Sequence, residues 1–500
     1  MGKAIKFICL PFVFILITAC TPQSQTVMPL PTVTSTTEIL PSPTSPSPTF
    51  PAPSSTPVLP SPTFTSPPPT VTQTPGPASL NPDGPYVLYF GPGGTWISNP
   101  DGTFVTRISD YEQTNSLDMH GNLSPQGDRL ALVTSNTQGL DLVLVSIPGG
   151  QAETIAHLID SPPPGAYDPT SANSFATMAI HDFDSIAWQP GAGRLLAFIG
   201  ATKGPTADLY LYDTQTKQVT QLTDGPSQAI SPTWSPDGQY ILHYGVSWVP
   251  PFGGAIVGPN RFDGVWAVRA SDGKLITLPK NQGDRPYFVG WQDNTHYITY
   301  DPGECSDANL RSVDVTSGKA TPLMQASFYS YIARSPENGN ILFSSAEECP
   351  GSLGEGIFLL PYGQTTPIKL FDKRAWEIDW MPESALFDAY PERLFSADGK
   401  TSYESPVYDQ SFKPAVSKLG YQTWVVYENY VGRVMVRVPG GDWQTILKDT
   451  SGELIWDPLV GNTLLIAGED GNLYAATYPD FTPRILANIT GGVSQMIWSP

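Results

Sequence analysis

The feature that most constrains the fold is a short repeat, which is clearest at Trp234-Ser235-Pro236-Asp237-Gly238 and is followed by the apolar run Tyr240-Ile241-Leu242. Pro presets φ for a turn, Asp caps the turn, and Gly supplies the positive φ that closes it. Degenerate copies lie mostly 36 to 57 residues apart. They start at Asn81, Leu123, Trp188, Trp291, Arg334, Trp380, Val416, Trp456 and Trp498. This period predicts the four-stranded blades of a β-propeller.

A second turn signal follows in most units, and it completes the pattern of strand, turn, strand, connection, strand, turn, strand. It occurs at Asn99-Pro100-Asp101-Gly102, Pro148-Gly149-Gly150, Ser271-Asp272-Gly273 and Pro439-Gly440-Gly441. Outside the N-terminal apolar segment, no stretch shows a sustained apolar period of 3.6 residues. The sequence therefore predicts an all-β chain.

The two ends of the repeat region complement each other. Met496–Pro500 is the first half of a unit, and residues 81–90 are the second half. Joined, they would form one blade and leave no sheet edge open. The spacing between Pro382 and Lys418 is short for a blade, so one of these two copies could be an insertion. We predict a single propeller of eight blades over residues 81–500, and seven or nine blades also fit the spacing.

The Trp-Ser-Pro-Asp-Gly signature resembles the propeller repeat of the TolB family, which is WD-repeat-like, and that of the propellers of prolyl oligopeptidases. The resemblance covers nearly all of residues 81–500 and is sharp only at residues 230–245. We expect it to cover the propeller without the hydrolase domain, since the sequence has no Gly-x-Ser-x-Gly elbow and ends with the last half blade. It favours envelope proteins as partners, by analogy of fold and not of site.

The N-terminus has the pattern of a secretory signal. Lys3 and Lys6 precede the apolar run Phe7–Ile17, which is too short to span a bilayer comfortably. The run ends in Ile17-Thr18-Ala19-Cys20, which resembles the lipobox of bacterial lipoproteins. The resemblance implies a signal over residues 1–20, removal of residues 1–19, and lipid on Cys20. An ordinary signal with a chance Cys is the alternative.

Residues 21–80 are rich in Pro, Ser and Thr, and Glu38 is their only charged residue. Such a segment has too little apolar surface to offset its ordering entropy, and Pro keeps it extended. We predict a disordered stalk that carries the propeller away from a bacterial membrane on the extracytoplasmic side. A proline-rich ligand for a partner is the alternative.

The formal net charge of −20 argues against nucleic acid, because binding to phosphates needs a basic surface. Acidity by itself names no partner, since it also keeps exported proteins soluble. The expected partners are an envelope protein or cell-wall glycan, and a lipid bilayer through the acyl anchor. We expect a monomer without a cofactor.

Cys305 and Cys349 form an even pair in an exported chain and are candidates for a disulfide. Cys305 lies 14 residues after Trp291, and Cys349 lies 15 residues after Arg334. Both therefore fall in the connection between the second and third strands of neighbouring blades. Free thiols or metal binding are the alternatives.

The longest excursions fall on the same face of the propeller, over residues 159–183 and 245–263. Aromatic and basic side chains on such loops are candidates for a ligand-binding surface. They are Tyr167, Phe175, Trp248, Phe252, Arg261 and Phe262. The alternative is that these side chains fold back and cover blade edges.

His120, His181 and Asp182 are weak candidates for a metal site, and hydrogen bonding within a blade is the favoured reading of the histidines. No catalytic residue can be assigned. We expect a non-catalytic binding propeller of the cell envelope that engages its partner through the loop face. The alternative is a carbohydrate-active enzyme or glycan sensor that uses channel carboxylates, and acids converging in the channel beside aromatics would favour it.

Overall fold

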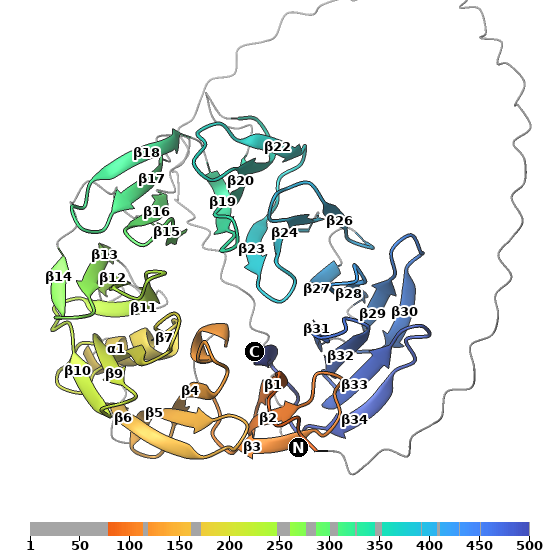
Figure 1. Ribbon diagram of the computed structural model, residues 1–500, viewed down its shortest axis with the longest axis horizontal. Coiled ribbons are helices and arrows are strands. Elements are labelled where there is room, and N and C mark those ends of the chain that lie inside the picture. The colour runs from red at the N-terminus through yellow and green to blue at the C-terminus, as the bar shows by residue number, and fades with distance from the viewer. Residues whose placement is uncertain are drawn as a thin grey trace, which may run out of the picture. The chain divides into compact units, whose positions relative to one another are not determined.

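The structure is a computed structural model, and it describes residues 79–113, 119–161, 172–247, 261–276, 287–300, 309–325, 328–345, 353–391, 393–407, 411–429, 431–450 and 452–499. Residues 1–73 and 74–500 form two separate units. The described residues all belong to the second unit, and they form nine sheets, eight of four strands and one of three. In Figure 1 the sheets follow one another around a common centre. This unit is a single β-propeller of nine blades.

Blade 1 is formed by the two ends of the repeat region, in the strand order β3-β2-β1-β35. Its outer strands belong to the first described residues, and its innermost strand belongs to the last. Register pairs such as Leu88 with Ile497 confirm the predicted closure of the ring. The bounds are β1 (Tyr86–Gly91), β2 (Gly94–Ser98), β3 (Thr106–Ser109) and β35 (Gln495–Ser499).

Blade 2 has three strands, and its inner position is held by a 3-10 turn, η1 (His120–Asn122), and an isolated bridge between Leu123 and Leu130. Blades 3 and 4 follow with four strands each. The bounds are β4 (Arg129–Ser135), β5 (Gly139–Ser146), β6 (Ala152–Asp160), β7 (Ile186–Trp188), β8 (Leu195–Gly200), β9 (Asp208–Asp213), β10 (Gln218–Gln221), β11 (Gln228–Trp234), β12 (Tyr240–Ser247), β13 (Arg261–Arg269) and β14 (Lys274–Ile276).

Blades 5 to 9 repeat the same four-stranded antiparallel order, with the first strand of each blade innermost. The bounds in blades 5 and 6 are β15 (Tyr287–Trp291), β16 (His296–Tyr300), β17 (Asn309–Asp314), β18 (Ala320–Gln325), β19 (Phe328–Arg334), β20 (Ile341–Ser345), β21 (Gly356–Leu360) and β22 (Ile368–Phe371). Those in blades 7 to 9 are β23 (Glu377–Met381), β24 (Leu386–Tyr390), β25 (Arg393–Ser396), β26 (Ser402–Glu404), β27 (Ser411–Val416), β28 (Gln422–Glu428), β29 (Val431–Arg437), β30 (Gln444–Lys448), β31 (Gly452–Trp456), β32 (Thr463–Gly468), β33 (Asn472–Thr477) and β34 (Arg484–Asn488).

The predicted number of eight blades is corrected to nine. The copies at Pro382 and Lys418 belong to two separate blades, 7 and 8. Blade 7 fits the short spacing because its connections are short: β24 ends at Tyr390 and β25 begins at Arg393. With such a tight central turn, four strands fit into the short spacing between Pro382 and Lys418.

The repeat motif forms the hairpin between the first and second strands of a blade. In blade 4 the Ser235 hydroxyl donates to the Asp237 carboxylate at 2.6 Å and accepts from the Tyr240 amide at 2.9 Å. Gly238 has φ +67° and donates its amide to the Ser235 carbonyl oxygen. A residue with a Cβ would be strained at this φ, which is why the turn ends in Gly.

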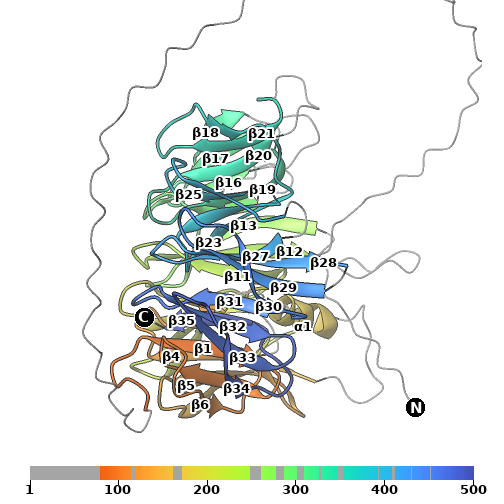
Figure 2. The ribbon, with the colours of Figure 1, turned by 90° about the vertical axis from the view of Figure 1, so that its right-hand side faces the viewer.

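The motif tryptophans join neighbouring blades. The Nε1 atoms of Trp188, Trp234 and Trp456 donate to carbonyl oxygens on the inner position of the preceding blade, at 2.8, 2.9 and 3.3 Å. Arg334 takes the Trp position in blade 6, and its Nη2 donates to the carbonyl oxygen of Gln292 at 3.4 Å. Clusters of buried apolar side chains fill every interface between successive blades around the ring. Figure 2 shows the sheets from the side.

One helix, α1 (Ala172–His181), interrupts the all-β pattern between blades 2 and 3. Ala176, Ala179 and Ile180 are fully buried, and with Phe175 they join the core that spans blades 2 to 4. Their spacing of three and four residues places them on one face of the helix. The helix spans too few residues to show a sustained period in the sequence. In the described part of the chain, no helix is long and apolar enough to cross a membrane.

Candidate functional site

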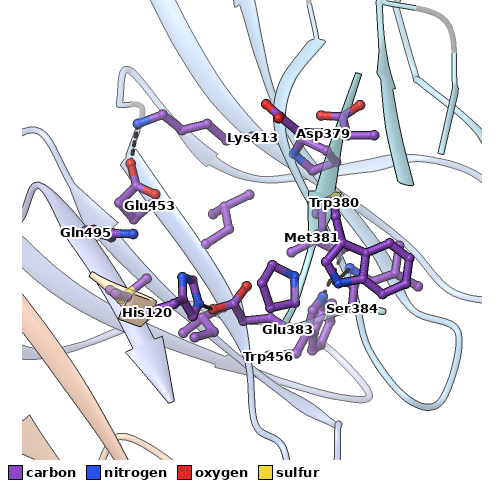
Figure 3. A pocket seen from close by; sticks show the side chains of 18 of the residues that line it. His120, Asp379, Trp380, Met381, Glu383, Ser384, Lys413, Glu453, Trp456 and Gln495 are labelled. Atoms are coloured by element: carbon purple, nitrogen blue, oxygen red, sulfur yellow. Dashed lines mark hydrogen bonds and ion pairs between the residues drawn. The ribbon is translucent and has the colours of Figure 1, made fainter. Parts of the chain in front are cut away.

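A cavity of about 660 Å³ lies beside the inner strands of blades 7, 8, 9 and 1, as Figure 3 shows. Its volume is within the usual range for small-ligand sites. The lining residues come from β23, β27, β31 and β35, from the turn after β23, from Asp388 of β24 and from His120 of η1. Segments far apart in the sequence thus meet at the channel of the propeller.

The polar lining has a simple origin in the repeat. His120, Glu377, Lys413, Glu453 and Gln495 each lie three residues before the motif residue of their own blade, which is Leu123, Trp380, Val416, Trp456 or Trp498. That position is near the start of the innermost strand of each blade. Inner strands have no neighbour on the channel side, so side chains here can reach the cavity.

Lys413 is placed by a distortion of its strand. The pairing of β27 with β28 shifts register between Phe412 and Ala415, and Lys413 has φ +47°. A bulge of this kind turns a side chain away from the regular pleat. The Lys413 Nζ atom forms an ion pair with Glu453 Oε1 at 2.5 Å, which joins blades 8 and 9. The dashed line in Figure 3 marks this pair.

His120 reaches the cavity from blade 2, the blade next to blade 1, and pairs with Glu383, in the turn after β23 of blade 7. The backbone of η1 is held on both sides of this histidine. The Met119 amide donates to Gln495 Oε1 at 3.0 Å, and the Asn122 carbonyl oxygen accepts from Trp188 Nε1 at 2.8 Å. The contact therefore links blade 2 to blade 7 across the channel.

Two aspartates face each other within blade 7. Asp379 in β23 and Asp388 in β24 are direct partners in the antiparallel register, so their side chains lie on the same face of the sheet. Burial raises the pKa of Asp388 to about 7, and the nearby charges of Asp379 and Glu377 add to this rise. Asp388 therefore exchanges its proton near neutral pH, unlike an ordinary aspartate.

The charge of the cavity is strongly negative. Five carboxylates line it, Glu377, Asp379, Glu383, Asp388 and Glu453. Lys413 and His120 are the basic residues of the lining. A recess with one dominant sign of charge concentrates ions of the opposite sign.

The two tryptophans of the cavity are part of the blade packing. Trp456 is 5% exposed and donates to the Ala415 carbonyl oxygen. Trp380 packs edge-on against Phe387, with ring centroids 5.0 Å apart. Trp456 thus has almost no free ring face, and stacking a sugar ring needs such a face. Acids do converge in the channel, as the carbohydrate alternative requires, but the aromatics beside them belong mainly to the repeat.

Most predicted site residues cannot be placed. Cys20, Tyr167, Trp248, Phe252, Cys305 and Cys349 lie outside the described residues. Arg261 and Phe262 begin β13, and their side chains also lie outside the described set. The two cysteines fall in the connections β16–β17 and β20–β21, which join second and third strands in neighbouring blades. The disulfide stays a prediction.

Phe175 is corrected from a ligand-face candidate to a core residue. It lies in α1 with 9% of its surface exposed and packs in the core of blades 2 to 4. The helix turns its apolar face inward, and this burial leaves the ring no free surface for a ligand.

The weak metal candidates take part in two separate contacts. His181 Nδ1 and Asp182 Oδ1 are 2.8 Å apart at the end of α1, and this hydrogen bond raises the pKa of His181. His120 pairs with Glu383 in the cavity. Within the described ranges, no three His, Cys, Asp or Glu side chains lie close enough to hold a metal ion.

The cavity residues other than His120 were not predicted from the sequence. A signal for several of them exists, namely a charged or polar residue three positions before the motif residue in blades 1, 2, 7, 8 and 9. This signal becomes visible only once the register of all nine blades is known. Asp388 has no comparable signal, because its position depends on the pairing of β23 with β24.

No protein-family model matches the sequence. The uncharacterized peptidase YuxL of Bacillus subtilis (strain 168) is 46% identical over 55 residues, which are 11% of this chain and 8% of that protein. The match thus covers a small part of the relative's length, and what that protein does is not transferred to this chain.

Among solved structures, the chain is similar to a eukaryotic initiation factor with a TM-score of 0.52 and 13% identity, covering 83% of this chain and 98% of that chain. TolB from Acinetobacter baumannii has a TM-score of 0.27 and 14% identity, over 74% and 82% of the two chains. A prolyl endopeptidase has a TM-score of 0.37 and 11% identity, and the likeness covers 73% of this chain and 49% of that chain. The neighbours include both kinds of propeller that the repeat resembles. The likeness to the initiation factor, at 13% identity, shows the fold alone, and the two likenesses with TM-scores below 0.5 carry no argument.

Proposed function

We propose that this chain is a binding propeller of the bacterial cell envelope, which recognises a cationic group of an envelope protein or cell-wall component in its channel cavity. One observation supports this most directly: five carboxylates line a cavity of about 660 Å³ in which Lys413 and His120 are the basic residues. The site proposed here is the channel, in place of the loop face expected from the sequence.

The charge arrangement favours a cation over a neutral ligand. Asp379 and Asp388 repel each other across β23 and β24, and the raised pKa of Asp388 reflects this cost together with burial. An ammonium or guanidinium group between them would relieve the repulsion. The amine of Lys413 already pairs with Glu453 in this cavity, so the geometry of the cavity is compatible with an amine. Binding should therefore weaken as salt rises.

The envelope part of the proposal rests on the N-terminal sequence. The lipobox-like Ile17-Thr18-Ala19-Cys20 and the proline-rich residues 21–80 support an acyl anchor followed by a spacer. The propeller would then be held outside the cytoplasm, within reach of envelope proteins and glycan. Labelling of intact cells with a fatty-acid analogue, with Cys20→Ser as the control, tests the anchor.

The partner is tested by photo-crosslinking on intact cells. A photoreactive amino acid at Met381, which lines the cavity, should capture a specific partner. The matched control places it at Trp376, which is 50% exposed and lies outside the lining. The double variant D379N/E453Q should lower capture from Met381 at least about tenfold, because it removes two carboxylates. Equal capture from both positions, unchanged in the double variant, would rule out the cavity as the site.

Isothermal titration tests the charge preference with defined probes. A lysine tripeptide amide is compared with its fully acetylated form, and glucosamine oligomers are compared with N-acetylglucosamine oligomers. The amine-bearing member of each pair should bind more tightly, and the difference should shrink in 0.5 M salt. Equal binding of both members would contradict a cation site.

A second function, glycan cleavage, is favoured by the Asp379–Asp388 pair. A carboxyl with a pKa of about 7 opposite a second carboxyl is a common arrangement for an acid and a base. In that case the wild-type protein would hydrolyse a cell-wall glycan, and both D388N and D379N would abolish turnover. Tight amine binding by a wild-type protein that shows no turnover would exclude this second function.

A further inference from the structure

Four aromatic side chains form a continuous row across blades 7 and 8. They are Trp376, Tyr390, Phe412 and Tyr427, and we call this set the aromatic row. The ring centroids of successive members are 5.9, 5.2 and 5.4 Å apart. We propose that the aromatic row is a saccharide-binding extension of the channel cavity, and that the partner is a glycan with free amino groups. The inference rests on the proposed function, in which the cavity binds a cationic group.

The aromatic row lies on the loop face, at the end of each blade where the second strand leads into the third. Tyr390 ends β24, and Tyr427 lies one residue before the end of β28. Trp376 immediately precedes β23, and Phe412 is the second residue of β27. The first and second strands of a blade are antiparallel, so the start of one lies beside the end of the other. All four side chains therefore belong to the face that the sequence suggested for ligand binding.

Tyr390 and three acids of the cavity lie on one face of blade 7. Glu377 is the direct partner of Tyr390 in the antiparallel register, and Asp379 is that of Asp388. Such partners share a face of the sheet, as do residues two apart in a strand. The Tyr390 ring stacks on Phe412 of blade 8, so this face is the one toward blade 8. The carboxylates therefore begin beside the aromatic row and continue along the strands into the cavity.

The charged lining begins next to the aromatic row on blade 8 as well. Phe412 is followed by Lys413, whose Nζ atom pairs with Glu453 Oε1 at 2.5 Å. In Figure 3, Asp379 and Lys413 lie at one side of the cavity, away from His120. A ligand that rests on the aromatic row can thus place a cationic group at the acids of the cavity.

Trp376 is the member of the row that offers a surface to a ligand. Half of its surface is exposed, whereas Trp456 of the repeat is 5% exposed. Its ring meets that of Tyr390 at 71°, and this contact covers one face of the indole at most. It lies four residues before the motif residue Trp380 and is not part of the repeat. Packing between blades therefore does not explain an indole at this position.

An aromatic face beside carboxylates matches the chemistry of an amino sugar. One face of a pyranose ring carries C–H groups that pack on an indole, while its hydroxyl and amino groups point outward, where carboxylates accept hydrogen bonds. A free amine also supplies the positive charge that neighbouring acids favour. A lysine-rich peptide offers the same charge without a flat ring, so it would use the acids and leave Trp376 without a contact.

Two probes with equal numbers of amines test this choice by isothermal titration. One is the β-1,4-linked glucosamine trimer, and the other is an N-acetylated lysine tripeptide amide. Trp376→Ala should weaken binding of the glucosamine trimer at least about fivefold and that of the lysine peptide by less than about twofold, because only the sugar stacks on the indole. Trp376→Phe keeps an aromatic face and should retain most of the affinity for the trimer.

Tyr362→Ala is the matched control, since it also removes an aromatic side chain that is 50% exposed, in the turn after β21 of blade 6. It should change the affinity for neither probe. An equal loss for both probes in Trp376→Ala would show that the row serves cations of any kind, and no loss for either would show that it is not a binding surface. Each of these results, and a wild-type protein that binds no saccharide, rejects the glycan partner. Circular dichroism of each variant shows whether the propeller is intact.

The N-acetylglucosamine trimer, which has no amine, separates this inference from the proposed function. If Trp376→Ala weakens its binding while D379N/E453Q leaves both amine probes unaffected, only the cation site is contradicted. If D379N/E453Q weakens both amine probes while Trp376→Ala affects no saccharide, only the aromatic row is contradicted. On intact cells, a photoreactive residue at position 376 should capture less partner than one at Met381, and this capture should also fall in D379N/E453Q, because the row holds only the part of the glycan outside the cavity.

Discussion

At the scale of single residues, Asp388 shows how the propeller holds an unfavourable group in its cavity. It is opposite Asp379, and burial is the largest cause of its raised pKa. A folded-state pKa of about 7, against roughly 3.9 in the unfolded chain, means that the folded state binds the proton more tightly. This group therefore lowers the free energy of unfolding as the pH rises from about 4 to about 7.

Asp388→Asn should consequently stabilise the protein at pH 8 by about 1–3 kcal/mol and have little effect at pH 4.5. Urea denaturation at the two pH values measures the difference. Glu469→Gln, which neutralises an exposed carboxylate, is the control and should change neither value. A similar effect of Asp388→Asn at both pH values would show that the aspartate is not titrating near neutrality.

His243 in β12 has the opposite pH dependence. It is 6% exposed, and burial lowers its pKa to about 4. The unfolded chain, with a pKa of roughly 6.5, then binds more protons than the folded one between about pH 4 and 6.5. The contribution of His243 to the free energy of unfolding therefore falls by about 2–3 kcal/mol as the pH falls through that window.

His243→Gln should flatten the loss of stability between pH 7 and 4.5, as measured by urea denaturation. His157→Gln is an informative comparison, because hydrogen bonds to Asp141 and Asp160 raise the pKa of His157. Its stabilising effect is present at low pH and is lost as the pH rises. The two variants should therefore change the pH profile in opposite directions, and equal changes would contradict both assignments.

At the scale of elements, the motif tryptophan is the unit that joins one blade to the next. Trp456→Phe removes the hydrogen bond to Ala415 and should cost about 1 kcal/mol, whereas Trp456→Ala also leaves a cavity and should cost about 3–5 kcal/mol. Trp376→Ala is the control, because that side chain is 50% exposed. Denaturant unfolding gives all three values, and an equal cost at both positions would show that Trp456 does not act as an inter-blade contact.

Helix α1 is an element that the repeat pattern did not predict. It lies in the excursion between β6 and β7, where the sequence suggested loops for ligand binding. Its three inward alanine and isoleucine side chains join a core made by blades on both sides of it in the sequence, so their burial depends on tertiary packing. Short turns, in contrast, were predicted correctly because Pro, Asp and Gly act on their own backbone.

At the scale of the whole molecule, the ring is closed by one strand pair, β1 with β35. Removal of residues 495–500 would leave the inner edge of β1 unpaired and expose Val87 and Leu88, which are fully buried. The free energy of unfolding should fall by about 5 kcal/mol or more, and size-exclusion chromatography should show aggregation. Removal of Pro500 alone is the control. An intact, monomeric protein after the larger deletion would contradict closure through β35.

The sequence by itself determined the repeating turn, the strands on either side of it, and the pairing of the two ends into one blade. These follow from local turn chemistry and from periodicity, which act over a few residues at a time. The ninth blade, helix α1, the Asp379–Asp388 pair and the contact between His120 and Glu383 were decided by the tertiary structure. Each of these depends on which distant segments pack together, and the ring sets that packing only when all nine blades are in place.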